Sequence, residues 1–147
     1  MVSDPSFELL FGVTVASLLV GFFGVATIFR VEVSRLMASH IRSGTPRLLG
    51  REDGAKNSTP GNLLFVAVMG VPICLLIIAN ILPRLWKLSP GAAIFASGGA
   101  VAVGAGLALL LVASERRSER PRRRTRWIGV ALVGGGVVSV ASALLLL

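Results

Sequence analysis

The 147-residue sequence contains one histidine, one cysteine and no tyrosine. A lone cysteine, Cys74, excludes an intramolecular disulfide and a redox-active thiol pair. His40 has no second histidine, cysteine or nearby carboxylate at metal-ligand spacing, so the sequence offers no metal-ligand set. We therefore predict neither a metal site nor another cofactor.

Acidic residues are also few, seven in all, and only Glu8 falls within a long apolar stretch. It lies at the edge of that stretch, where it can reach water or interact favourably with the first turn of a helix. No apolar stretch contains the base or nucleophile that catalysis requires. We predict that the protein is not an enzyme; a membrane-embedded enzyme with a cleft near His40 is the least favoured alternative.

Charge of either sign is otherwise absent from four apolar stretches, which dominate the sequence. Each is long enough, at 1.5 Å per residue, to cross a hydrocarbon core of about 30 Å. A water-soluble bundle would instead show a polar face on every helix. We predict an all-α membrane protein with an antiparallel bundle of four transmembrane helices, spanning about residues 7–29, 63–82, 91–113 and 127–147.

The distribution of basic residues predicts an orientation for these spans. Thirteen of the 15 Lys and Arg residues lie in two alternate connections, 30–62 and 114–126, whereas the short second connection has only Arg84 and Lys87. By the positive-inside rule the two basic connections are cytoplasmic and both termini are outside. The first span lacks the basic leader of a signal peptide, so we expect it to remain as an anchor. This pattern predicts a multi-pass protein of the cell membrane.

The segment after the first span continues with helical periodicity. Val33, Leu36 and Met37 recur on one face, and Glu32 and Arg35 fall on another. This spacing predicts an amphipathic cytoplasmic extension of the first helix, lying at the membrane interface or covering the ends of other helices.

Small residues predict where the helices pack. Between Ala92 and Ala108, 12 of 17 residues are Gly, Ala or Ser, which favours a central position for the third span. Small residues at intervals of four allow close helix approach in a membrane. The candidate packing residues are Gly12, Gly21, Gly98, Ala102, Gly104, Gly106, Gly135 and Ser139.

The second span has bulky side chains and two special residues. Pro72 removes an amide donor and predicts a kink, which would leave the Val68 carbonyl available to a neighbour. Asn80 is the only carboxamide within a span and is expected to form a polar contact between helices. The short turn that follows predicts that the second and third helices are packed neighbours.

The connection 114–126 contains seven arginines and has no interleaved aromatic side chain. This pattern favours contact with anionic lipid head groups over nucleic-acid binding. The candidate lipid-contact residues are Arg116, Arg117, Arg122, Arg123 and Arg124.

The sequence thus predicts a non-enzymatic accessory, assembly or scaffold component that packs through its Gly/Ala-rich helices. Its partners would be the lipid bilayer and either further copies of itself or a larger membrane complex. An oligomeric small channel or transporter is the alternative. A pore requires its hydroxyl side chains to converge on a cavity; the candidates are Thr14, Ser17, Thr27, Ser97, Ser139 and Ser142.

Overall fold

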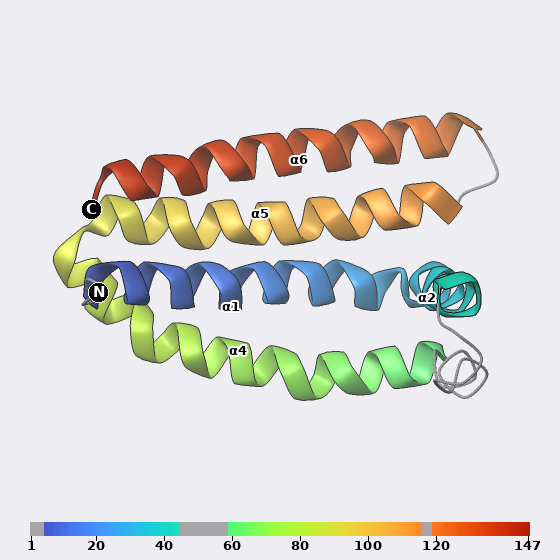
Figure 1. The fold of residues 1–147 in the computed structure, drawn as a ribbon, viewed down its shortest axis with the longest axis horizontal. Coiled ribbons are helices and arrows are strands. Elements are labelled where there is room, and N and C mark those ends of the chain that lie inside the picture. Colours follow the sequence, from blue (N-terminus) through green and yellow to red (C-terminus); the bar gives the residue numbers. More distant parts are fainter. Residues whose placement is uncertain (1–4, 45–58, 116–118) are drawn as a thin grey trace.

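The computed structural model describes residues 5–44, 59–115 and 119–147, and the side chains of residues 5–39, 59–114 and 122–147. The described parts are helical. In chain order the helices are α1 (Pro5–Ile28), α2 (Arg30–Gly44), α4 (Pro60–Leu88), α5 (Pro90–Glu115) and α6 (Glu119–Leu145) (Figure 1).

Four of these helices are long and apolar enough to cross a membrane, which confirms the prediction of four apolar helices. Two of them extend well beyond the predicted spans. Helix α4 continues through Pro83 to Leu88, and only Ser89 separates it from α5. The Ser89 amide donates to the Leu85 carbonyl at 2.9 Å, and the Ser89 hydroxyl accepts from the Ala92 amide at 3.3 Å. One residue therefore ends one helix and begins the next.

Helix α6 likewise begins inside the predicted basic connection. Pro121 falls in its first turn, where backbone amides have no partner within the helix, so the proline costs no hydrogen bond. The arginines from Arg122 to Arg126 are consequently on a helix and have helical spacing.

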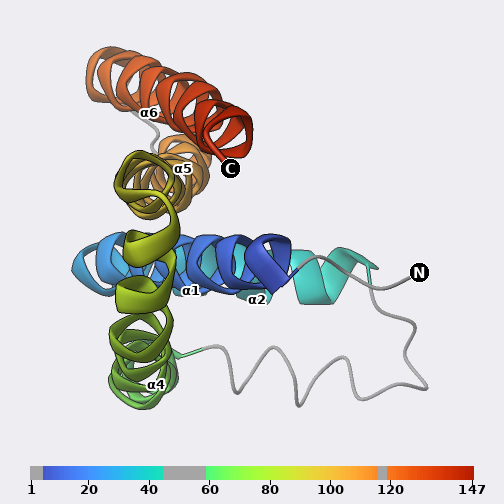
Figure 2. The ribbon, with the colours of Figure 1, turned by 90° about the vertical axis from the view of Figure 1, so that its left-hand side faces the viewer.

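The long helices lie in a single row in the order α6, α5, α1, α4 (Figures 1 and 2). Helix α5 packs against α6 and α1, and α4 packs mainly against α1. The second and third long helices are in contact where they join, at Leu85 and Ala92, but α1 lies between most of α4 and α5, so the two are neighbours only in part. Figure 2 shows the last turns of α4 rising past the end of α1 to reach α5. There Leu85 is fully buried in a cluster with Leu10, Val13 and Ala92.

Glycines allow α1 and α5 to approach each other closely. A methyl group placed on Gly104 would overlap the Leu18 carbonyl oxygen, and one on Gly21 would overlap the Val101 carbonyl oxygen. Backbone therefore lies against backbone at this crossing, where a side chain on either glycine would separate the helices.

Helices α5 and α6 meet along a seam of small residues seven positions apart. Gly99 lies opposite Gly136, Gly106 lies opposite Gly129, and Ala92 shares a buried cluster with Ala143. A step of seven residues forward along α5 therefore corresponds to a step of seven residues back along α6. A seven-residue repeat keeps a stripe facing its partner over several turns. This seam fixes the face of α6 that points toward α5 and therefore the face that stays exposed.

Helix α2 is a separate helix and not a straight continuation of α1. A turn at Phe29 redirects the chain, and α2 is seen end-on where the long helices are seen from the side (Figure 1). Its Val33 is 2% exposed and belongs to a buried cluster with Ala26, Leu63 and Val112. Arg30 and Arg35 remain exposed. The amphipathic face of α2 therefore covers the ends of three long helices.

Candidate functional site

The predicted packing residues fall into two groups. Gly21, Gly104 and Gly106 are buried, and methyl groups added to them would strike the backbone of a neighbouring helix. A methyl group on Gly12 would lie 3.0 Å from the Ile81 side chain of α4. Ser139 is half-buried on α6, next to Gly99.

The other small residues do not form the expected contacts within this chain. Gly98 and Gly135 are exposed, and a methyl group on either would meet no atom within 4 Å. Ala102 is half-buried on the same outward side of α5 as Gly98. The residues next to them, Gly99 and Gly136, form the close contact instead. The intervals of four thus include both buried positions, such as Gly104 and Gly106, and exposed ones, whereas the seven-residue repeat contains only buried positions.

Pro72 and Asn80 both point away from the rest of the chain. Helix α4 buries Leu63, Ala67 and Cys74 against its neighbours, while Pro72 and Asn80 are exposed on the opposite side. Figure 1 shows α4 bowed along its length. The expected contact of Asn80 with another helix is not formed among the described residues, because α4 lies at the edge of the row.

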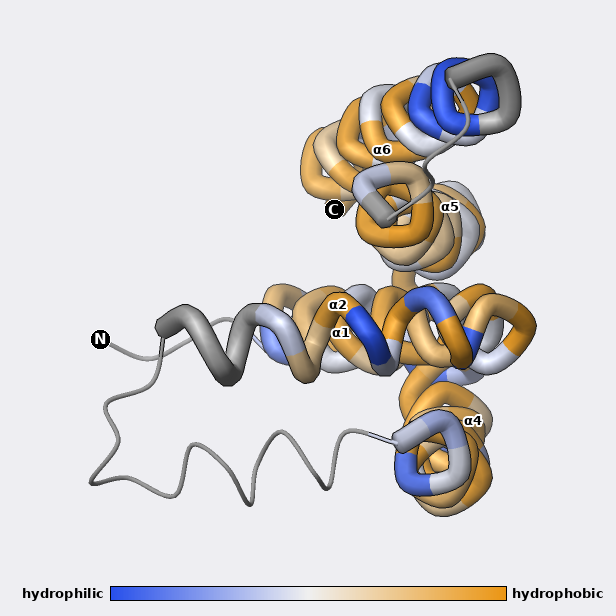
Figure 3. Tube along the Cα trace, turned by 90° about the vertical axis from the view of Figure 1, so that its right-hand side faces the viewer, coloured by the Kyte–Doolittle hydropathy of each residue, from blue (hydrophilic) through white to orange (hydrophobic). Residues whose placement is uncertain are grey.

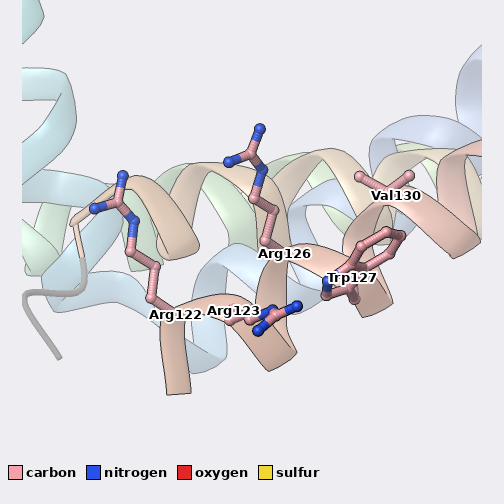
Figure 4. A pocket seen from close by; sticks show the side chains of 5 residues that line it. All are labelled: Arg122, Arg123, Arg126, Trp127 and Val130. Carbon is pink, nitrogen blue, oxygen red and sulfur yellow. The ribbon is translucent and has the colours of Figure 1, made fainter. Parts of the chain in front are cut away.

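The arginines at the start of α6 line an open hollow of about 510 Å³ together with Trp127 and Val130. Arg122, Arg126 and Val130 are spaced by four residues, as are Arg123 and Trp127. Positions four apart lie above one another on a helix, so the five residues form two adjacent ridges. In Figure 4 the side chains of Arg122 and Arg126 extend to the same side of the helix.

Both the seam with α5 and the change from polar to apolar residues along α6 position this hollow. Thr125 and Gly129 are buried on the side toward α5, which leaves the arginines and Trp127 exposed. The candidate span of α6 runs from Arg122 to Leu145, and all of its charged residues lie between Arg122 and Arg126. Figure 3 shows hydrophilic residues at the first turns of α6 and hydrophobic residues along the rest of the helix. The hollow therefore lies where the helix changes from polar to apolar.

Of the predicted lipid-contact residues, Arg122 and Arg123 line the hollow. Arg124 is exposed on a different side of α6 and does not line it, while Arg116 and Arg117 lie outside the described residues. The sequence prediction did not include Arg126 or Trp127 in the site. If the helix had been expected to begin one turn before Trp127, helical spacing would have grouped Arg122, Arg123, Arg126 and Trp127.

The described lining of the hollow carries positive charge. Three of its five described lining residues are arginines, and none is acidic. Glu119 precedes Arg122 by three residues, and its side chain lies outside the described ones. Even with one negative charge from Glu119, three guanidinium groups leave the site positively charged, as suits phosphate or carboxylate oxygens.

The described residues contain no group of three or more His, Cys, Asp or Glu that could hold a metal ion. Cys74 is a buried free thiol on α4, and the side chain of His40 lies outside the described part of the chain. Among described residues, the site at the start of α6 is therefore defined by guanidinium and aromatic chemistry.

Comparison with protein family models, with curated proteins and with solved structures finds no match to this chain.

Proposed function

We propose that this chain is a non-enzymatic accessory, assembly or scaffold component of the cell membrane, and that it packs laterally against further membrane helices. In this proposal both termini are outside and the two basic connections are cytoplasmic, because they hold 13 of the 15 basic residues. Helix α2 then lies at the cytoplasmic surface.

The observation that carries the proposal is the uncovered small-residue surface of α5 and α6. Gly98 on α5 and both Gly134 and Gly135 on α6 meet nothing within this chain. Ala131 and Val138 are exposed beside Gly134 and Gly135, on the free edge of the row. Small residues permit the backbone of another helix to approach closely. In the apolar windows of α4 and α6 only 11% and 17% of residues are buried, so single copies leave much helix surface for partners and lipid.

The hydroxyl side chains support a scaffold over a pore within one chain. Thr14, Thr27, Ser97 and Ser142 each donate to the carbonyl one turn back in their own helix, at 2.7 to 2.9 Å. The O–H donors of these four side chains are therefore satisfied within single helices, without a contact between helices. Ser17 is buried and has no hydrogen-bond partner among the residues that the structure describes. The small channel or transporter remains the alternative and requires several copies.

Cysteine labelling tests the orientation. In a Cys74→Ala background, Leu88→Cys reports on the end of α4 and Arg124→Cys reports on the start of α6; both positions are exposed. We expect a membrane-impermeant maleimide to label position 88 in intact cells and position 124 only after permeabilisation. The reverse pattern would overturn the orientation.

Crosslinking tests the lateral contact. In the same background, Gly135→Cys is compared with Ser139→Cys, whose cysteine faces the α5 seam next to Gly99. We expect a bifunctional maleimide to join position 135 to a second copy or to another membrane protein, identified by mass spectrometry. Crosslinking from both positions alike, or from neither, would refute a specific contact at the free edge of α6.

A further inference from the structure

The hollow at the start of α6 changes in chemical character along the helix axis. Its charged residues come first, Trp127 follows and Val130 is deepest, over a rise of about 12 Å at 1.5 Å per residue. Trp127 and Val130 are 65% and 48% exposed, so the apolar part of the hollow is open as well. A ligand that fills it must itself be charged at one end and apolar at the other.

We infer that this hollow is a binding site for an anionic phospholipid, with the phosphate on Arg122, Arg123 and Arg126 and the start of an acyl chain along Val130. The inference rests on the membrane placement in the proposed function. Trp side chains are favoured at the depth of lipid head groups, which places Trp127 beside the glycerol region. Basic pockets at the cytoplasmic ends of helices are suited to such head groups.

The number of guanidinium groups favours a headgroup with two phosphates over one with a single phosphate. Each guanidinium can bind a phosphate through two parallel N–H···O hydrogen bonds. Three of them around a hollow of about 510 Å³ provide more donors than one phosphate can use. A second phosphate would occupy further donors and reduce the remaining positive charge.

A soluble phosphate or a nucleic acid fits this site less well than a lipid. Either could engage the arginines, but neither would extend toward Val130, which lies within the apolar window of α6. Val130 continues the ridge of Arg122 and Arg126, so a ligand with a hydrocarbon portion can follow the hollow from the arginines to an apolar side chain. A lipid, a soluble phosphate and a nucleic acid would all be recognised through phosphate oxygens. Only the lipid would also contact Val130.

The test uses the purified full-length chain in a zwitterionic detergent, with bound lipid quantified by native mass spectrometry during titration. The lipids are cardiolipin (two phosphates), phosphatidylglycerol (one phosphate) and phosphatidylcholine. Arg122→Gln/Arg126→Gln removes two charges from the hollow. Arg84→Gln/Arg124→Gln is the matched control, because it removes two exposed charges that do not line the hollow.

We expect the order cardiolipin, phosphatidylglycerol, phosphatidylcholine, and a loss of about 30-fold in cardiolipin affinity in the Arg122/Arg126 variant. That figure assumes about fivefold for each arginine near a membrane surface. The control should change the affinity less than about fivefold. We also expect excess inorganic pyrophosphate or a short DNA duplex to leave bound cardiolipin in place.

Three results would overturn the inference. An equal loss in the two double variants would show diffuse attraction to a basic surface. Displacement of cardiolipin by pyrophosphate or DNA at comparable concentration would show a phosphate site without lipid specificity. Equal affinity for the two anionic lipids would remove the preference for two phosphates. Failure of the membrane placement itself is distinguishable, since the chain would then stay folded and dispersed without any amphiphile.

Discussion

The neighbouring glycines Gly135 and Gly136 provide a matched test of the α5/α6 seam. A methyl group on Gly136 would lie 2.5 Å from the Gly99 carbonyl oxygen and 2.7 Å from a Val103 methyl group. A methyl group on Gly135 would meet nothing within 4 Å. The two glycines differ by one position on the same helix, so a substitution changes the helix propensity equally at both.

The magnitudes determine the expected result. Replacing glycine by alanine within a helix gains up to about 1 kcal/mol from propensity. Inserting a methyl group into a filled contact costs about 1 to 3 kcal/mol. The propensity gain is common to both variants and cancels in the comparison. We therefore expect Gly136→Ala to be less stable than Gly135→Ala by about 1 to 3 kcal/mol.

The stability can be measured by titrating a denaturing detergent into mixed micelles and following helix content and the accessibility of Cys74, which is buried in the folded chain. Gly135→Ala should unfold at the same detergent fraction as the parent or at a slightly higher one. Indistinguishable midpoints for the two variants would refute the assignment of the seam to the Gly136 face.

Further predictions concern other contacts in the row. Leu85→Ala should lower the free energy of unfolding by about 2 to 5 kcal/mol because Leu85 is fully buried. Leu76→Ala, at a side chain that is 71% exposed, should change it by less than about 0.5 kcal/mol. Gly104→Leu should prevent accumulation of folded protein in membranes, since it inserts a side chain where α1 and α5 touch, while Gly98→Leu should accumulate normally on an immunoblot. Thr14→Val should cost less than about 1 kcal/mol in the same titration, because its hydroxyl bonds only to its own helix; a larger loss would indicate a contact between helices.

Hydropathy and length were sufficient to predict the existence of the four apolar helices, because an uncharged stretch of about 20 residues leaves few alternatives to a membrane span. The helix ends were less predictable. Pro83 was taken as part of a turn, yet α4 continues through it to Leu88. Pro121 falls in the first turn of α6, where proline is tolerated, so the basic segment became helical.

The rotation of the third and fourth helices could not be predicted from small residues alone. Small residues occur on every side of α5, so intervals of four are present in several registers. Only the pairing of two seven-residue repeats, through Gly99 and Gly106 on one helix and Gly129 and Gly136 on the other, selects a register. The register depends on the repeats of both helices, so it cannot be predicted from the sequence of either helix alone.

The basic site was predicted in part for a related reason. Counting charges over the connection 114–126 identified Arg122 and Arg123 but gave them no geometry. Once these residues are on a helix, Arg126 and Trp127 follow by spacing, and Arg124 is placed on another side. The charge count was therefore informative about location and uninformative about which side chains act together.

The position of α1 between α4 and α5 constrains the order in which the chain can assemble. Two helices joined by Ser89 alone would ordinarily close on each other as soon as both had entered the bilayer. Here that closure would exclude α1 from its place against Gly104. Helix α1, which precedes both in the chain, must therefore be in place before α4 and α5 can close on each other. Slowed translation between residues 44 and 60 would lengthen the time that α1 spends without α4 or α5 packed against it.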